Sequence, residues 1–350
     1  MSGNKKQILI PLIALIALAV FNLIMDSSFF IIKFGPNAQG FNVLSGNLID
    51  VFDKGSELAI LALGMTLVTS ACGGQDISVG ATLAVAGSVM MRFLTGGANS
   101  VDKVCVPVFV AFILGCIAAM ILGAFNGVLV AKFKIQPMVA TLILFTAGRP
   151  IAAWINDNRN IKIKDATFSY WGTNLPNCPV PTPVLLTILC ILVMFLILKF
   201  TNLGLYCQAV GINESSSRLN GIHPNLMKFL SFVILGAFVS VAALIKISRY
   251  STINYSGVAK DIEMDAILAV ALGGNPLGGG KFNIWASVIG AYVIQLLTVT
   301  LYAFRVSPDA LPAYKAVVVI LLVVASSPVV QRAFDKLKRK LASKKNKEVA

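Results

Sequence analysis

Three ionisable side chains lie beside apolar runs of the sequence, where a charge is costly to bury. Asp76 follows a Gly-Gly pair, Arg149 closes one apolar stretch, and Asp265 precedes another. Charged groups inside a membrane protein are rare, and by default they indicate a functional or structural partner. We therefore expect these three side chains to cap broken helix ends, to pair across helices or to line a pathway.

Two further charged residues beside apolar runs have simpler interpretations. Lys246 lies at the edge of an apolar run, and we expect its ammonium to reach the membrane interface along its own aliphatic stem. Glu263, with Asp265, precedes the apolar run 266–272, where carboxylates favour a helix N-terminus. No nucleophile is evident beside either carboxylate, so the pair does not indicate acid–base catalysis.

The side chains that most enzymes and metal sites need are scarce. His223 is the only histidine, and it lies in a polar loop. The 6 cysteines form no Cys-x-x-Cys pair, and most lie in or beside apolar runs, so we interpret them as small core residues. We expect no catalytic centre, metal or cofactor on this chain.

Two glycine-rich stretches repeat in the two halves of the chain. Residues 65–80 read MTLVTSACGGQDISVG, and residues 265–280 read DAILAVALGGNPLGGG. At an offset of 200 residues, Gly73 aligns with Gly273, Gly74 with Gly274 and Gly80 with Gly280. The broken end of a helix leaves unpaired backbone groups, which are tolerated in a membrane only where they line a cavity or are buried in protein. Paired interruptions of this kind point to a transport pathway, and two ordinary loops are the alternative.

The second stretch ends in glycines before Lys281 and so resembles a phosphate-binding loop. Asn275 stands where that motif needs glycine, and Phe282 replaces the Ser or Thr that would bind magnesium. The chain has no ATP-binding motif, so any nucleotide energy must come from another subunit.

The loop 200–226 contains the signals of a short amphipathic helix. Asn213 is a good N-cap, and Glu214 follows in the first turn, where an acidic side chain is favourable. Arg218 lies one turn after Glu214, and Gly221 can end the helix. A helix of one or two turns is marginal alone. We therefore expect packing or a docked partner to hold it, with a solvated surface helix as the alternative.

The overall composition requires a membrane around these segments. Of the 350 residues, 57% are hydrophobic and only 13% are charged, about half the charged share of a soluble domain. This excludes a disordered chain, a disulfide scaffold and a soluble enzyme. The net charge of +14 would suggest nucleic acid in a soluble protein. Because the cations are scattered between apolar runs, we expect no nucleic-acid partner and assign them to loops that contact anionic membrane lipid.

The apolar runs predict an all-α polytopic membrane protein with about ten transmembrane helices, two of them short and broken. The runs are 8–25, 57–72, 79–95, 104–130, 138–155, 183–199, 227–247, 263–273, 283–304 and 313–330. The short segments are 57–72 and 263–273. Because the loops between the runs are brief, we treat 1–350 as a single domain with a basic tail, 331–350.

The distribution of charge orients the predicted spans. Cytoplasmic loops of membrane proteins carry an excess of Lys and Arg. With the N-terminus inside, more than half of the 29 cations fall on the inner side, including the tail 331–350. Most acids, among them Asp50 and Asp53, fall in outer loops. We expect a multi-pass protein of the cell (inner or plasma) membrane with cytoplasmic N- and C-termini.

Four runs in order along the chain carry a family signature. They are ALGMTLVTSACGGQDISVGATLAVAG (62–87), FNGVLVAKFKIQPMVATLILFTAGR (125–149), AVGINESSSRLNGI (209–222) and DAILAVALGGNPLGGGKFN (265–283). The sequence from about 57 to 330 resembles the sugar-importer permeases of the ABC transporter superfamily, in the ribose/galactoside group, and within it the galactofuranose permeases most. Gln75 and Pro150 depart from the pattern of that group.

The resemblance implies a fold like that of type II ABC importers and a permease subunit that moves a monosaccharide, such as galactofuranose or a related sugar, into the cytoplasm by alternating access. It also implies three partners: a second permease copy in a homo- or heterodimer, a cytoplasmic ATPase subunit that holds ATP and Mg²⁺, and an extracytoplasmic sugar-binding protein. Matched residue by residue, Glu214, Arg218 and Gly221 belong to the element that couples to the ATPase. The core motifs near the pathway include Gly73, Gly74, Asp76, Asn126, Asp265, Gly273 and Gly274.

Other functions stay open on the sequence. One alternative is a permease for another small solute, such as a nucleoside or a branched-chain amino acid. A second is an ion-coupled secondary transporter, which would need titratable groups at the membrane midplane, whereas the charges here lie at the ends of the runs. An integral-membrane enzyme is disfavoured by the lack of His, Asp and Glu clusters.

Overall fold

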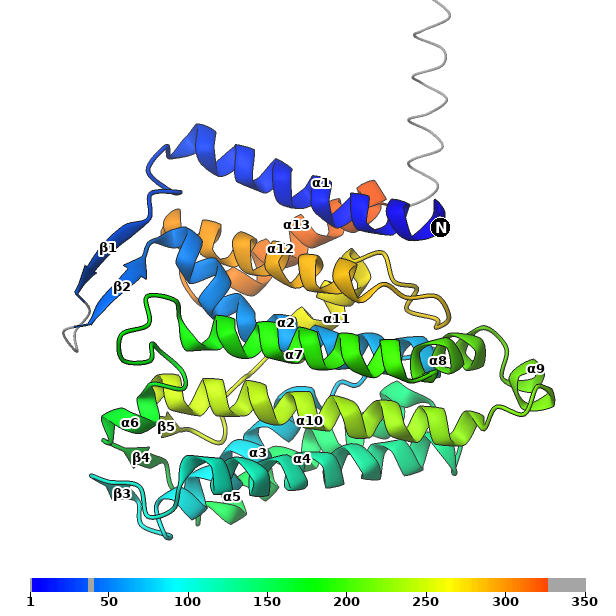
Figure 1. Cartoon of the computed structure of the whole chain (residues 1–350), viewed down its shortest axis with the longest axis horizontal. Helices are drawn as coiled ribbons and strands as arrows, with labels where there is room; N and C mark the ends of the chain where they lie inside the picture. Colours follow the sequence, from blue (N-terminus) through cyan, green and yellow to red (C-terminus); the bar gives the residue numbers. More distant parts are fainter. Residues whose placement is uncertain (1, 37–40, 327–350) are drawn as a thin grey trace, which may run out of the picture.

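Helices form most of the chain in the computed structural model, which describes residues 2–36 and 41–326 (Figure 1). The helices of this part of the chain are α1 (Ser2–Met25), α2 (Asn47–Cys72), α3 (Val79–Leu94), α4 (Val108–Ala131), α5 (Pro137–Ile155), α6 (Ala166–Ser169), α7 (Thr182–Phe200), α8 (Leu203–Ile212), α9 (Glu214–Leu219), α10 (Pro224–Tyr250), α11 (Ile262–Leu272), α12 (Ile284–Ala303) and α13 (Leu311–Ser326). The strands are β1 (Lys33–Pro36), β2 (Asn42–Ser45), β3 (Ser100–Val101), β4 (Ile161–Ile163) and β5 (Thr252–Ile253). The predicted helical class is therefore confirmed, and the short strands lie in the connections between helices.

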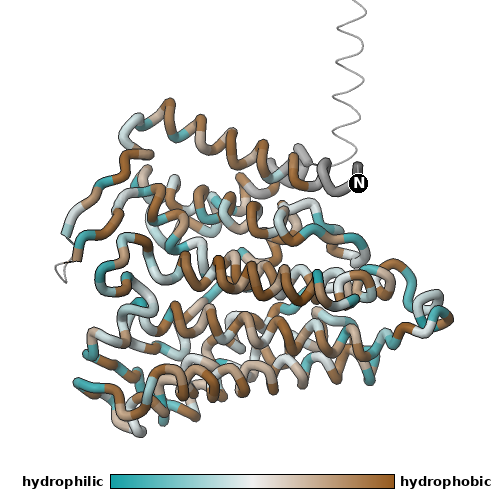
Figure 2. Tube along the Cα trace, in the orientation of Figure 1, coloured by the Kyte–Doolittle hydropathy of each residue, from teal (hydrophilic) through white to brown (hydrophobic). Residues whose placement is uncertain are grey.

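Six helices are long and apolar enough to cross a membrane: α2, α4, α5, α7, α10 and α12. Only 22% of the apolar window is buried in α4 and in α7, so most of their apolar side chains face outward. Brown, hydrophobic segments follow these helices in Figure 2. A helix forms all its backbone hydrogen bonds internally, so a helix with an apolar outer surface is stable in lipid. The protein is thus a multi-pass membrane protein. The predicted runs also form α1, α3, α11 and α13, but the count of about ten spans stays a prediction.

Helix α2 lies at the centre of the bundle. It packs against α7, α10, α11 and α12, and 94% of its apolar window is buried. Small residues allow the close approach: a Cβ atom on Gly64 would lie 2.7 Å from the side chain of Leu235 in α10. Small residues at helix contacts are typical of membrane bundles, where close packing drives helix association. The core is therefore built around α2 and α10, and the lipid-facing helices surround it.

The connections lie at two opposite ends of the bundle. Strand β4 pairs with both β3 and β5, which joins the segments after α3, α5 and α10 in one small sheet. The backbone N–H of Leu44 donates to the carbonyl of Pro179 (3.1 Å), which adds the segment after α1 to the same end. Figure 1 shows α8 and α9 at the other end, on the right of the view, which is also the side on which α1 begins. Successive segments therefore alternate between the ends, as helices that cross a membrane in turn require.

Helix α2 corrects two expectations. The run 57–72 was predicted to be short, but α2 has 26 residues and begins at Asn47. Asp50 and Asp53, assigned to an outer loop, lie inside this helix. The prediction was wrong because charged residues reduced the apparent apolar length of the run, whereas in the structure Asp53 pairs with Arg249 of α10.

The second predicted short segment is confirmed, since α11 has 11 residues and ends before Gly273. The loop 200–226 is more ordered than expected, because α8 precedes the predicted short helix, α9. The basic tail, 331–350, lies outside the described residues.

Candidate functional site

The two glycine-rich segments lie against each other. Helix α2 ends at Cys72 with Gly73 in the left-handed conformation (φ +62°), which favours glycine. The corresponding left-handed residue after α11 is Gly274 (φ +70°), one position later than the alignment suggests, because Gly273 has φ −63°. Both helices are therefore broken where the sequence predicts, although the two breaks differ in detail.

Several contacts join these segments, which we call the glycine contact (70–75 and 277–280). Gly280 donates its backbone N–H to the Ser70 carbonyl (3.0 Å), and the Ser70 hydroxyl donates to the Gly280 carbonyl (2.6 Å). The Gln75 amide donates to the Leu277 carbonyl (3.1 Å). A Cβ atom on Gly73 would lie 2.7 Å from the Gly278 carbonyl oxygen. The two parts of the sequence repeat thus satisfy each other's free backbone groups.

Asp76 and Asn126 are brought together beside this contact. Asp76 is buried, and its Oδ1 accepts from the backbone N–H (2.7 Å) and the hydroxyl (2.6 Å) of Ser78, just before α3. Asn126 of α4 donates to the Ser78 hydroxyl (2.9 Å) and lies 3.5 Å from Asp76 Oδ2. Buried polar groups that bond one another in this way hold the start of α3 against α4.

Arg149 and Asp265 are held by different partners. Arg149 of α5 donates to the carbonyls of Ser256 and Val258 (both 3.0 Å), in the segment before α11. Asp265, in the first turn of α11, pairs with Lys315 of α13 at 2.7 Å. Arg149 thus supports the backbone that leads into the short helix, while Asp265 joins that helix to α13. A role for either side chain in a translocation pathway stays a prediction.

The predicted α9 element forms as the sequence indicates. The Asn213 side chain accepts from the Ser216 N–H (2.9 Å), and Arg218 pairs with Glu214 at 3.1 Å. Gly221, with φ +78°, donates its N–H to the Arg218 carbonyl (3.1 Å), which closes the helix end. Six residues are therefore fixed at both ends, which compensates for the weak intrinsic stability of so short a helix.

Lys228 of α10 is a partner of α9 that the sequence analysis missed. Its ammonium donates to Glu214 Oε2 at 2.7 Å. This hydrogen bond, with the charges of Lys228 and Arg218, outweighs partial burial and holds the pKa of Glu214 below its usual value. A cavity of about 430 Å³ lies here, and Lys134 and Gln136 also line it. Helix α9 is thus tied to a long membrane helix through a charged pair.

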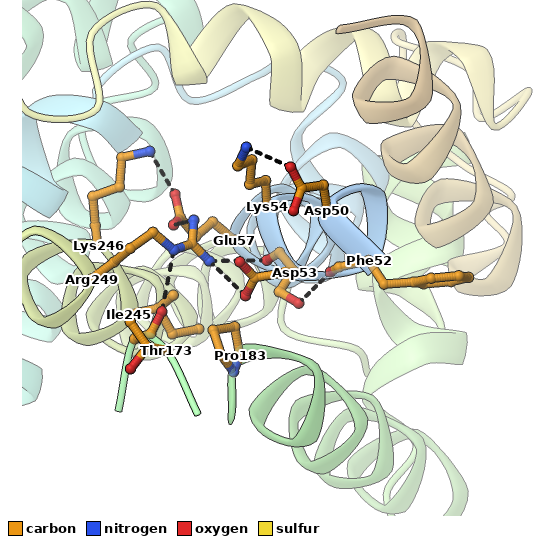
Figure 3. A network of polar contacts seen from close by, with 12 residues as sticks. Asp50, Phe52, Asp53, Lys54, Glu57, Thr173, Pro183, Ile245, Lys246 and Arg249 are labelled. Carbon is orange, nitrogen blue, oxygen red and sulfur yellow. Dashed lines mark hydrogen bonds and ion pairs between the residues drawn. The ribbon is translucent and has the colours of Figure 1, made fainter. Parts of the chain in front are cut away.

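Four charged side chains form a second site that sequence reasoning missed, shown in Figure 3. This ion cluster consists of Asp53 and Glu57 of α2 and Lys246 and Arg249 of α10. Glu57 is 2% exposed and accepts from both Arg249 (2.6 Å) and Lys246 (2.8 Å). Arg249 also pairs with Asp53 (3.1 Å) and donates to the Gly172 carbonyl (3.3 Å) before α7. The cluster therefore joins α2, α10 and the segment that leads into α7.

The ion cluster corrects the interpretation of Lys246, which was expected to extend to the membrane interface. Its ammonium is instead paired, because Glu57 supplies a buried counter-charge. A signal was present in the sequence: each helix carries two like charges three or four positions apart, and such residues share one helix face. Only the packing of α2 against α10 shows that the two faces meet.

The ion cluster borders a cavity of about 690 Å³ between α2, α10, α11, α12 and α13. Its size lies within the range of small-molecule sites in proteins. Among the residues that the structure describes, no group of three His, Cys, Asp or Glu side chains could hold a metal ion. The cavity, the glycine contact and α9 are thus three places among the described residues where this chain could bind or respond to another molecule.

Comparison with known proteins identifies related sequences. The family described as "Branched-chain amino acid transport system / permease component" matches residues 47–327. The fructose import permease protein FruF of Bifidobacterium longum is 32% identical over 95% of this chain and 91% of its own length. The galactofuranose transporter permease protein YtfT of Escherichia coli is 35% identical over 81% of this chain and 80% of its own length.

The ribose import permease protein RbsC of Escherichia coli is 34% identical over 80% of this chain and 85% of its own length. No solved structure matches the chain. The similarity covers α2 to α13, and therefore includes the glycine contact, α9 and the ion cluster.

Proposed function

We infer the function from the family to which this chain belongs, that of branched-chain amino acid transport system permease components. The relatives named above are import permeases for fructose and ribose and a transporter permease for galactofuranose. We propose that this protein is the membrane-spanning permease subunit of an ATP-driven ABC importer for a monosaccharide. The observation that carries the proposal is the similarity to a sugar import permease over 95% of the chain.

The proposal places the protein in the cell (inner or plasma) membrane with both termini in the cytoplasm and about ten spans. The alternation of connections between two ends supports it, because β3, β4 and β5 share one end while α8 and α9 lie at the other. A sugar-binding protein would deliver substrate at the end that carries the strands. A second permease copy would complete the pathway, and an ATPase subunit would supply the ATP site.

The ATPase would dock on α8 and α9, and the packing behind these helices supports a coupling role. A Cβ atom on Gly211 of α8 would collide with the Ser70 carbonyl oxygen and would lie 2.6 Å from the Gly280 nitrogen. The backbone of α8 therefore rests directly on the glycine contact. A displacement of α8 by the ATPase would reach the broken ends of α2 and α11 through packed atoms, which is the contiguous contact that coupling between distant sites uses.

A branched-chain amino acid is the second candidate substrate, because the family description names it. One experiment separates the candidates: reconstitution of the permease with its ATPase and binding protein in liposomes, followed by uptake of labelled fructose, ribose, galactose or leucine. We expect ATP-dependent uptake of a monosaccharide. Uptake of leucine alone would show that the substrate is a branched-chain amino acid and not a sugar. Uptake that needs an ion gradient but no ATP hydrolysis would contradict the whole proposal.

The docking role of α9 has its own test. We expect Glu214→Arg to weaken co-purification of the ATPase, because it reverses a charge on α9 and breaks the pairs with Lys228 and Arg218. The matched control is Asp102→Arg, a charge reversal at an 84% exposed side chain at the opposite end of the bundle. Equal co-purification of the two variants would contradict the docking role.

A further inference from the structure

Charged and apolar side chains together line the cavity between α2, α10, α11, α12 and α13, and the charges are balanced. Five ion pairs have at least one partner in its wall: Lys54–Asp50 (3.0 Å), Lys246–Glu57 (2.8 Å), Arg249–Glu57 (2.6 Å), Arg249–Asp53 (3.1 Å) and Lys315–Asp265 (2.7 Å). The two remaining charges, Lys260 and Asp261, are of opposite sign and adjacent in sequence. When the partners Asp50 and Asp53 behind the wall are included, the charges around the cavity therefore sum to zero.

This balance selects against charged solutes. An anion that paired with Lys246 or Lys315 would compete with the carboxylate that each already holds, and one at Lys260 would share the wall with the carboxylate of the next residue, Asp261. Removing one partner from a buried pair leaves an uncompensated charge, which is strongly unfavourable. A zwitterionic amino acid that bound between Lys246 and Asp265 would disturb a pair at each of its ends. A neutral solute disturbs none of them.

The cavity nevertheless offers free hydrogen-bonding groups. The Gln295 amide, the Lys260 ammonium and the Tyr302 hydroxyl bond to no residue in the part of the chain that the structure describes, and all three residues line the cavity. The Lys246 ammonium has three donors and gives one to Glu57. Donors and acceptors from α10, α12 and the turn before α11 thus line one cavity, which suits a molecule with several hydroxyl groups.

Two aromatic rings stand beside these hydrogen-bonding groups in the cavity wall. Tyr250 and Tyr302 both line the cavity, and the Lys246 ammonium lies 5.8 Å from the centre of the Tyr250 ring. The faces of aromatic rings pack against the apolar C–H faces of small molecules. The ion cluster of Figure 3 fixes Lys246 beside this ring, because Glu57 is held in turn by Arg249. The donor is thus pre-positioned before any ligand arrives, which lowers the entropy cost of binding.

We propose that this cavity is a binding site for a neutral monosaccharide within the permease, and that Gln295, Lys260, Lys246 and Tyr302 bond the sugar hydroxyls. This inference rests on the proposed import function and adds that the permease itself recognises the sugar and rejects charged analogues. Each of these side chains would contribute single hydrogen bonds, so we expect weak binding and fast release.

Saturation-transfer nuclear magnetic resonance on the full chain in lipid nanodiscs tests the site directly, because the method detects weak ligands. The probes are fructose, ribose and galactose, with fructose 6-phosphate and leucine as charged comparators. We expect transfer to at least one neutral sugar and to neither comparator. We expect binding to be about fivefold weaker in Gln295→Met, as for the loss of one hydrogen bond. Gln208→Met, in a separate groove between α7, α8 and α12, should bind as the wild type does.

The outcomes separate this inference from the proposed function. Equal transfer from wild type and Gln295→Met, or transfer to fructose 6-phosphate, overturns the sugar site, and so does an absence of transfer to every sugar. ATP-dependent sugar uptake by the complete importer would then still uphold the proposed function. If Gln295→Met is not recovered folded, Lys260→Met replaces it, because Lys260 is exposed and makes no ion pair with the described residues.

Discussion

At the scale of single residues, the glycine contact depends on atoms that leave no space for a side chain. Gly73 combines a left-handed backbone with a carbonyl oxygen, that of Gly278, only 2.7 Å from the place where a Cβ would stand. Gly278, across the contact, has neither constraint, since nothing lies within 4 Å of its Cβ position. The glycines of the repeat are therefore not equivalent, and only some of them are required by geometry.

We predict that Gly73→Ala destabilises the protein and Gly278→Ala does not. The left-handed conformation alone costs a residue with a side chain about 1–2 kcal/mol, and the overlap with the Gly278 carbonyl adds to this. Gly278→Ala, a substitution without such contacts, should change the free energy of unfolding by no more than about 0.5 kcal/mol. Thermal unfolding in detergent, followed by size-exclusion chromatography, measures both. Similar Tm values for the two variants would show that the segments do not approach as described.

Glu214 gives a prediction about pH. Its pKa is lowered in the folded state by Lys228 and Arg218. A carboxyl group with a lowered folded-state pKa stabilises the fold above its unfolded pKa, and this contribution is lost as the pH falls through the folded value. We expect the difference in Tm between wild type and Glu214→Gln to be present at neutral pH and to shrink in acid. In a Lys228→Met background, the pH dependence of that difference should be reduced; an unchanged pH profile would contradict the pairing.

At the scale of elements, the ion cluster explains why α2 continues through residues that look like a loop. Charged groups in a membrane protein are tolerated when they pair inside the bundle. Arg249 and Lys246 of α10 supply the partners, and Arg249 also reaches the backbone before α7. The cluster thus fixes the position of three elements at the end of the bundle that carries the strands.

We predict that Glu57→Gln destabilises the protein by about 3 kcal/mol, because it removes the buried partner of two cations. The control is Lys54→Gln, one turn away on the same helix, which removes a pair with Asp50 whose side chains are 51% and 48% exposed. Such exposed pairs contribute about 0–1 kcal/mol. Chemical or thermal unfolding of the two purified variants checks the difference, and equal losses would argue that the cluster is no more important than a surface pair.

At the scale of the whole molecule, the connections assign each end of the bundle to one side of the membrane. Strands β3, β4 and β5 gather the segments after α3, α5 and α10, and α9 lies far from them (Figure 1). Because a membrane admits no crossing except through a spanning segment, residues at the two ends must face different compartments.

Labelling with a membrane-impermeant thiol reagent tests this topology. We expect the native Cys105, which is exposed at the end that carries the strands, to react from outside intact cells. In Ser215→Cys, the new thiol on the exposed side of α9 should react only after the membrane is opened. Labelling of both positions from the same side would contradict the alternating arrangement.

The sequence by itself determined the class of the protein and its family. Apolar runs of membrane length are a local property of the chain, so the helices could be predicted without knowledge of their neighbours. The same holds for α9, whose signals at Asn213, Glu214 and Gly221 all act within one or two turns. The four motif runs predicted the sugar permease family, and the comparison confirmed it.

Only the tertiary structure decided which distant residues meet. The pairing of Gly73 with Gly278, of Asp76 with Asn126 and of Glu57 with Arg249 depends on how helices far apart in sequence are packed. The length of α2 was misjudged for the same reason, since a charged residue favours a loop until a partner on another helix neutralises it. Local periodicity carries no information about that partner, because the partner enters only when the helices pack.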